Sequence, residues 1–105
     1  MFIAMNRFRI VRDAEEDFVK VWRERDSFLD EVAGFKSFAL LRGPEVTEPE
    51  EDAHVLYASH SVWESREAFE DWTKSENFRR AHAQAGQTKG IYLGHPELEL
   101  FEQVL

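Results

Sequence analysis

Apolar and polar residues alternate along the first segment of the chain in the way typical of a β-strand. One face of this segment carries Phe2, Ala4, Asn6, Phe8 and Ile10, and the other carries Ile3, Met5, Arg7, Arg9 and Val11. Because successive side chains of a strand point to opposite faces, the pattern predicts a strand over residues 2–12. Asn6 is the exception, since it is polar and shares its face with apolar residues.

In the next segment the apolar residues change to helical spacing. They recur at Phe18, Val21, Trp22, Phe28, Leu29 and Val32. Asp13 followed by Glu16 resembles a capping box with Asp in the place of Ser or Thr. We therefore expect an amphipathic helix that begins after Asp13 and ends near Gly34.

Three further strands are indicated by residue type and alternation. Residues 35–42 and 54–63 are rich in apolar and β-branched or aromatic residues, and residues 97–105 alternate between charged and apolar side chains over much of their length. Between the first two of these segments, a Gly-Pro pair and an acidic run over 43–52 predict a solvated loop.

A second helical region is expected after residue 63, with Ser65 as a plausible N-cap. Phe69 and Trp72 lie on one stripe of this region, which pauses around 75–77 and resumes from Phe78. The resumed stretch includes His82 on its apolar stripe. Glycines at positions 86 and 90 are expected to end it.

The resulting order is strand, helix, strand, strand, helix, strand. It predicts an α+β fold in which two helices cover one face of a four-stranded antiparallel sheet, as a single domain over residues 1–105. The other face carries Ile3, Met5 and Val11, whose burial against an identical sheet would form a barrel. We therefore expect a homodimer.

Composition narrows the function. Thirteen Lys and Arg against twenty-one Asp and Glu give a formal net charge of -8, which argues against nucleic acid or an anionic membrane surface as a partner. The chain has no cysteine, so disulfides, thiolate zinc sites and iron–sulfur clusters are excluded. With no recognisable signal peptide or membrane-spanning run, we expect a cytoplasmic protein.

Three residues stand out as candidates for chemistry, and each has an ordinary structural explanation. His82 either faces an apolar cavity, where it is suited to bind haem iron, or is a core histidine hydrogen-bonded to backbone. Trp72 either lines the same cavity or is simply a core residue, as we expect for Trp22 and Trp63. Asn6 either donates to a ligand between sheet and helices or bonds neighbouring backbone.

The remaining motifs are less informative. His54 and His60 share one face of the third predicted strand, but no nearby third ligand accompanies them, and strand alternation explains their spacing equally well. The chain also lacks a P-loop, a nucleophile elbow and any glycine-rich phosphate cradle. The commoner classes of enzyme are therefore disfavoured.

Three features taken together resemble the antibiotic biosynthesis monooxygenase (ABM) domain and, within it, the IsdG-like haem-degrading monooxygenases. They are Asn6 within Ala4-Met5-Asn6-Arg7-Phe8, the stretch from Trp63 to Trp72, and Phe78-Arg79-Arg80-Ala81-His82. The similarity covers nearly the whole chain. It implies a ferredoxin-like fold that dimerises into an α+β barrel, with one haem per subunit between sheet and helices.

The resemblance also implies roles for individual residues. His82 would be the axial ligand of the haem iron, and Asn6 would donate a hydrogen bond to oxygen bound on the opposite side of the iron. Trp72 would press against the porphyrin and keep it ruffled. Phe78 and Arg79 would complete the haem site. Because the propionates need positive charge in an acidic protein, Arg79, Arg80 and Lys89 are either their partners or an ordinary solvated helix face.

In such an enzyme haem is both cofactor and substrate. A reductase or small reductant supplies electrons, O2 is activated at the iron, and the ring opens to a bilin-type product with release of iron. Two alternatives stay open on the sequence alone. One is a cofactor-free monooxygenase of the same superfamily that oxidises a polycyclic phenol, and the other is a dimeric haem-binding protein without turnover.

Overall fold

The computed structural model describes residues 1–24, 29–76, 78–79 and 90–105. Its elements are β1 (Phe2–Val11), the 3-10 turn η1 (Arg12–Ala14), α1 (Glu15–Glu24), η2 (Leu29–Glu31), β2 (Phe35–Val46), η3 (Glu50–Asp52), β3 (His54–Trp63), α2 (Arg66–Thr73) and β4 (Glu97–Glu102). Strands and longer helices follow the predicted order, so the α+β, ferredoxin-like arrangement is confirmed.

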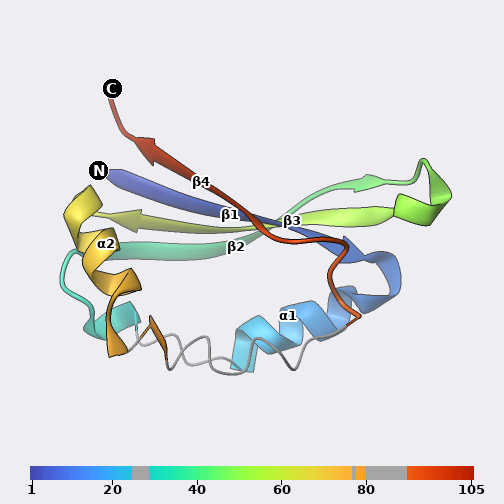
Figure 1. Ribbon diagram of the computed structural model, residues 1–105, viewed down its shortest axis with the longest axis horizontal. Helices are drawn as coiled ribbons and strands as arrows, with labels where there is room; N and C mark the ends of the chain where they lie inside the picture. The colour runs from blue at the N-terminus through green and yellow to red at the C-terminus, as the bar shows by residue number, and fades with distance from the viewer. Residues whose placement is uncertain (25–28, 77, 80–89) are drawn as a thin grey trace.

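The four strands form an antiparallel sheet in the order β2-β3-β1-β4. β1 is therefore a central strand, and its register places Asn6 opposite Ser59 on β3 and opposite Leu98 on β4. Figure 1 shows α1 and α2 on the same side of the sheet, toward opposite ends of the long strands. The sheet surface between the two helices is the floor on which the site described below is built.

The first helix is shorter than the sequence predicts. Its described part spans Glu15–Glu24, whereas a helix from Asp13 to near Gly34 was expected. Leu29–Glu31 forms a separate 3-10 turn, so the apolar spacing there marks buried side chains rather than one continuous helix. Phe28 lies outside the described residues. The expected capping box is also wrong, because Asp13 lies within η1, which has no side-chain cap.

The second strand is longer than predicted. It continues to Val46 instead of ending at Arg42, and the expected acidic loop shrinks to the hairpin tip that carries η3. The register against β3 shifts between Arg42 and Glu45, and Gly43 and Pro44 lie within this irregularity. Proline lacks an N–H donor, but β2 is an edge strand of the sheet, where that loss is tolerated.

Each helix covers its own cluster of buried side chains. The cluster beneath α1 contains Phe8, Ile10, Ala14, Phe18, Val55, Tyr57 and Ile91. The cluster beneath α2 contains Phe2, Ala4, Leu29, Trp63 and Phe69. Ile10, Phe18 and Trp63 have no exposed surface. Because complete burial of one large apolar side chain contributes about 1.5–3 kcal/mol, these clusters hold both helices against the sheet.

The start of α2 is fixed by a cap and by a close approach of backbone. Ser65 is the N-cap, as predicted, and its hydroxyl accepts a hydrogen bond of 3.1 Å from the Ala68 amide. Gly34, just before β2, has a φ of +84°, and a Cβ at this position would lie 2.5 Å from the Cβ of Ala68. Glycine is therefore required here both by conformation and by space.

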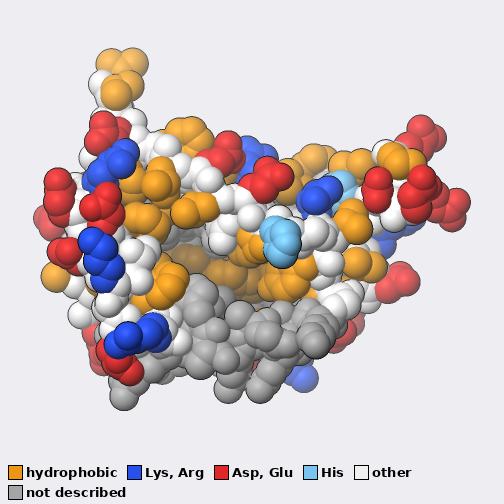
Figure 2. Space-filling view, in the orientation of Figure 1, with side chains coloured by type: hydrophobic (Ala, Val, Ile, Leu, Met, Phe, Trp, Pro, Cys, Tyr) orange, Lys and Arg blue, Asp and Glu red, His pale blue; other side chains and the backbone are white. Residues whose placement is uncertain are grey.

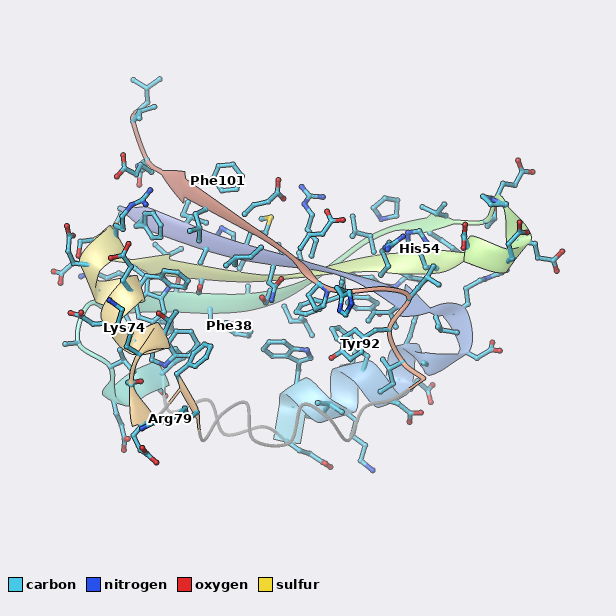
Figure 3. All side chains as sticks on the ribbon, viewed as in Figure 1. Phe38, His54, Lys74, Arg79, Tyr92 and Phe101 are labelled. Carbon is cyan, nitrogen blue, oxygen red and sulfur yellow. The ribbon has the colours of Figure 1, made fainter. Side chains whose placement is uncertain are left out.

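The sheet face away from the helices is rich in apolar side chains. By register it carries Ile3, Met5, Val11, Ala39, Leu41, Leu56, Ala58, Val62 and Phe101. Leu41 is 43% exposed and Phe101 is 48% exposed, and Figure 3 shows Phe101 on this side of the sheet. We call these residues the outer face. No helix in the described part of the chain has the length and apolar character needed to cross a membrane.

Candidate active site

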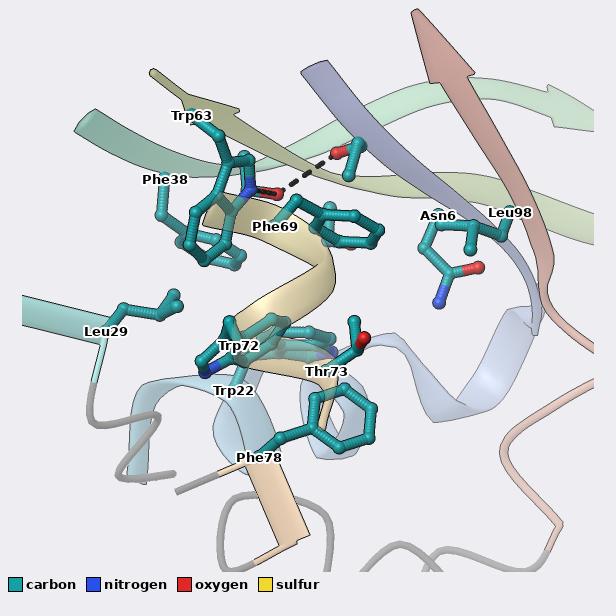
Figure 4. A pocket seen from close by; sticks show the side chains of 13 residues that line it. Asn6, Trp22, Leu29, Phe38, Trp63, Phe69, Trp72, Thr73, Phe78 and Leu98 are labelled. Atoms are coloured by element: carbon teal, nitrogen blue, oxygen red, sulfur yellow. Dashed lines mark hydrogen bonds between the residues drawn. The ribbon is translucent and has the colours of Figure 1, made fainter. Parts of the chain in front are cut away.

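A pocket opens on the helix side of the sheet, between α1 and α2 (Figure 4). It is lined by Ala4, Asn6, Trp22, Leu29, Phe38, Ser59, Ser61, Trp63, Phe69, Trp72, Thr73, Phe78 and Leu98. Figure 2 shows apolar side chains gathered around this hollow. The cavity itself measures about 180 Å³, which is smaller than the roughly 300–1,000 Å³ of most small-molecule sites, and it is open to solvent at its mouth.

One wall of the pocket is built around Trp72 on α2. The centre of its ring system lies 5.3 Å from that of Trp63, 6.4 Å from Phe69 and 4.8 Å from Phe78. Phe78 meets the indole edge-on, at an interplanar angle of 85°. Aromatic pairs in such geometries each contribute about 0.5–1.5 kcal/mol beyond the area that they bury. Trp72 is therefore held firmly while it remains only half-buried beside the pocket.

The opposite wall is formed by Trp22 from α1 and Phe38 from β2. Their rings stack at a centroid distance of 5.4 Å and an angle of 20°, which bridges the helix and the edge strand. Trp22 also contacts Phe8 and Phe18 in the core. From the sequence we expected Trp22 only to pack, and helical spacing alone does not reveal that it also lines a cavity. Trp63 is fully buried, as expected.

Asn6 lies on the floor of the pocket, in the middle of β1. Figure 4 shows its amide nitrogen directed toward the space between the walls. Its Oδ1 atom is buried and has no hydrogen-bond partner among the described residues. Because an unpaired buried acceptor costs about 1–3 kcal/mol, a donor from water or from a bound ligand is favoured at this position. The alternative of a hydrogen bond to neighbouring backbone is not seen for Oδ1.

The pocket is uncharged as well as aromatic. None of its described lining residues is acidic, basic or histidine, and its polar groups are one amide, three hydroxyls and the indole N–H groups of three tryptophans. These groups donate and accept hydrogen bonds but are not acids or bases near neutral pH. The described lining is therefore suited to bind and orient a flat, largely apolar molecule rather than to transfer protons by itself.

The ionisable groups with shifted pKa values lie elsewhere, near the start of α1. Glu15 Oε1 accepts hydrogen bonds of 2.8 Å from Arg42 Nε and from the Tyr57 hydroxyl. The bond from Arg42, reinforced by that from Tyr57, lowers the pKa of Glu15 below its ordinary value. Burial, with the bond to Glu15, raises the pKa of Tyr57. This cluster fastens α1 to β2 and β3 and does not line the pocket.

The other candidate residues from the sequence are placed as follows. Phe78 lines the pocket, whereas Arg79 is exposed and forms an ion pair with Glu76; Figure 3 shows its side chain pointing away from the sheet. His82 lies outside the described residues, as do Arg80 and Lys89. Asn6, Trp72 and Phe78 thus meet at one cavity, and the role of His82 stays a prediction.

The remaining histidines do not form a metal site in the described structure. His54 and His60 lie on the same side of the sheet as the outer face, away from the pocket, and His54 Nδ1 lies 2.7 Å from the Asp52 carbonyl oxygen. Within the ranges that the structure describes, no three His, Asp or Glu side chains are grouped so as to hold a metal ion. Strand alternation accounts for this pair.

Comparison with known proteins agrees with this architecture. A family model described as antibiotic biosynthesis monooxygenase matches residues 1–84. The chain belongs to this family. The expected membership of the ABM domain family is thereby confirmed, and the similar proteins include those of the IsdG-like type that the sequence motifs resemble.

Several ABM relatives are similar over most of their length. A heme-degrading monooxygenase of Listeria welshimeri is 27% identical over 95 residues, which cover 85% of this chain and 75% of that protein. The heme-degrader MhuD of Mycobacterium tuberculosis, solved with two hemes in its active site, superposes with a TM-score of 0.73 at 26% identity, over 100% of this chain and 97% of that one.

A second solved structure has the same fold but comes from an oxygenase of another kind. SnoaB of Streptomyces nogalater, a cofactor-independent oxygenase, superposes with a TM-score of 0.69 at 22% identity, over 99% of this chain and 93% of that one. This likeness supports the fold of the ABM chain alone. Within one fold the chemistry is decided by the residues of the pocket.

Proposed function

We propose that this chain is a haem-degrading monooxygenase, which opens the porphyrin ring with O2 and reductant and releases iron and a bilin-type product. The observation that carries the proposal is the pocket itself. It is an uncharged hollow with aromatic walls on two sides and a single amide, Asn6, at its floor. The heme-degrading relatives, at 26–27% identity over most of the chain, support the same assignment.

The described residues match a porphyrin in polarity. A flat apolar macrocycle is matched by the ring systems of Trp72 and Trp22, which come from different helices. The buried Oδ1 of Asn6 has no hydrogen-bond partner among the described residues, and Figure 4 shows Nδ2 directed toward the space between the walls. Its Nδ2 is therefore available to donate to an oxygen-bearing group in the pocket.

Each candidate residue then has a proposed part in the reaction. Haem supplies the oxygen chemistry when bound, and it is consumed as the substrate. His82 is the proposed iron ligand, Asn6 orients the reacting group by hydrogen bonding, and Trp72 presses on the macrocycle. Phe78 supports Trp72 through their edge-on contact. Arg79 is exposed beside the site and, with its ion pair to Glu76 broken, is proposed to meet a propionate.

Electrons come from an external donor in this proposal. The described lining of the pocket contains no cysteine, histidine or charged group, and the chain as a whole has no cysteine. A reductase or a small reductant is therefore the proposed partner. Proton delivery is assigned to water at the open mouth, since the described lining residues are not acids or bases.

A homodimer is part of the proposal. The outer face presents Leu41 and Phe101 with nearly half of their surfaces exposed, and an apolar sheet face of this kind is stabilised when a second copy covers it. Light scattering on a size-exclusion column is expected to give twice the monomer mass. Leu41→Glu should shift the population toward monomer; if the wild-type protein elutes as a monomer at micromolar concentration, the dimer is excluded.

Single substitutions test the assignment residue by residue. His82→Ala is expected to weaken haem binding and abolish degradation, while Asn6→Ala and Trp72→Ala are expected to retain haem and lose turnover. Haem affinity is measured by absorption titration and turnover by loss of the Soret band after addition of ascorbate in air with catalase present. Intact binding and turnover in His82→Ala would show that the ligand assignment is wrong.

One observation favours a second candidate, the cofactor-free oxidation of a polycyclic phenol. The buried Oδ1 of Asn6 is an acceptor, and a phenolic hydroxyl is a donor of the kind that it lacks. In that case oxygen uptake with phenolic substrates would proceed without haem, and it would persist in His82→Ala. Oxygen uptake that requires haem would exclude this candidate.

A further inference from the structure

The polar groups of the pocket differ in whether the fold already uses them. Ser61 donates a hydrogen bond of 3.3 Å to the Ala4 carbonyl oxygen and accepts one of 2.9 Å from Trp63 Nε1. Thr73 donates to the Glu70 carbonyl oxygen at 2.7 Å. Both hydroxyls therefore have structural partners within the protein. They contribute to the position of Trp63 and to the end of α2.

Ser59 and Asn6, in contrast, make no such hydrogen bonds within the described part of the chain. Both line the pocket, and they are direct cross-strand partners in the register of β1 and β3. No side-chain hydrogen bond of either residue is found in the described part of the chain, and the Asn6 Oδ1 atom is buried without a partner. Directly opposite residues have Cβ atoms about 4.5–5.5 Å apart, so their polar ends are able to reach one common atom.

We propose that Ser59 is a second hydrogen-bonding residue for the ligand and acts beside Asn6 on the same polar atom. The inference rests on the proposed function, because it takes the ligand to be haem carrying a small molecule on its iron. The surrounding residues explain why two donors matter. In the row across the sheet, Asn6 and Ser59 are flanked by Leu98 on β4 and Leu40 on β2.

The leucines at both ends of this row limit its polar side chains to Asn6 and Ser59. An apolar border on both sides leaves a bound polar atom with few other partners, and a hydrogen bond is stronger where water is excluded. The amide donates from Nδ2, and the hydroxyl both donates and accepts. A packing role alone would be filled equally well by alanine or valine at position 59.

The chain offers a matched control for testing Ser59. Ser61 has the same side chain, lies on the same strand and face, and lines the same pocket, but its hydroxyl is occupied by Ala4 and Trp63. Ser59→Ala and Ser61→Ala thus remove the same group from neighbouring positions. Ser59→Thr keeps the hydroxyl and serves as the rescue variant.

The readout is the affinity of azide for the ferric haem complex. This affinity is measured from the shift of the Soret band as azide is added at saturating haem. Azide bound to iron accepts hydrogen bonds, so the loss of one donor is expected to weaken azide binding about two- to tenfold in Ser59→Ala. Ser59→Thr should restore the affinity to within about twofold. Ser61→Ala should lower the melting temperature, and its azide affinity should fall less than that of Ser59→Ala.

Three results would overturn the inference, and they separate it from the proposed function. Equal azide affinity in Ser59→Ala and wild type, with haem bound to both, removes Ser59 from the site and leaves the proposed function standing. An equal loss in Ser59→Ala and Ser61→Ala indicates a general disturbance of β3. Failure of the wild-type protein to give a Soret complex overturns both proposals together.

Discussion

Replacement of Gly34 by alanine tests how the sheet and α2 are joined. The φ of +84° places Gly34 in the left-handed region, which costs a residue with a Cβ about 1–2 kcal/mol. The added Cβ would also lie 2.5 Å from the Cβ of Ala68, and relieving such an overlap costs about 1–3 kcal/mol. We expect a total loss of about 2–5 kcal/mol in the free energy of unfolding.

Gly90→Ala is the matched control for Gly34→Ala. Its φ of +88° imposes the same conformational cost, but no described atom lies within 4 Å of a Cβ built at position 90. At about 5 °C per kcal/mol for a domain of this size, the melting temperature should fall by roughly 10–25 °C in Gly34→Ala and by roughly 5–10 °C in Gly90→Ala. Equal losses in the two variants would refute the steric contact with α2.

Gly34→Ala should also affect the pocket, because α2 carries Phe69 and Trp72. Movement of α2 away from β2 would displace both rings from the wall that they form with Trp63. We therefore expect weaker haem binding in Gly34→Ala than in Gly90→Ala when both are folded at low temperature. Near-ultraviolet circular dichroism reports the change in tryptophan packing independently of any ligand.

Three other perturbations follow from the described contacts. In the folded state the pKa of Glu15 lies below its ordinary value, so its stabilising contribution is present at neutral pH and is lost as pH falls through the folded pKa. Glu15→Gln should therefore lower the melting temperature at pH 7 and flatten its fall in acid; an equal loss at every pH would contradict this. Phe18→Ala, at a site with no exposed surface, should cost about 3–5 kcal/mol in denaturant melts. Trp63→Phe should cost about 1–3 kcal/mol, since it removes the donor to Ser61 and some volume.

The fold was predictable where one kind of periodicity runs through a whole element. Alternation in residues 2–12 predicts a strand that the structure gives as Phe2–Val11, and the apolar and aromatic content of residues 54–63 predicts one that it gives as His54–Trp63. Apolar spacing failed from Leu29 onward, because a 3-10 turn buries Leu29 as effectively as a helix would. It also failed at Gly43 and Pro44, since an edge strand accommodates residues that usually end a strand.

The site was predictable in part. Asn6 drew attention because a polar residue on an apolar strand face needs a partner, and it does lie in the pocket. Trp22 and Ser59 were missed, because their importance depends on which residues lie across from them on other elements. A helix residue that stacks on Phe38, or a serine opposite Asn6, is identified only by strand register and tertiary packing. The contribution of His82 remains a prediction.

The most direct test of haem degradation is an absorption titration of the purified protein with ferric haem, followed by ascorbate in air with catalase present. The proposal predicts a saturable Soret band that decays into a bilin-like spectrum while iron is released to a ferrous chelator. A Soret band that stays unchanged under reductant would contradict turnover and indicate a haem-binding protein. No specific Soret band at any haem concentration would contradict the proposal entirely and favour the cofactor-free oxidation of a phenol.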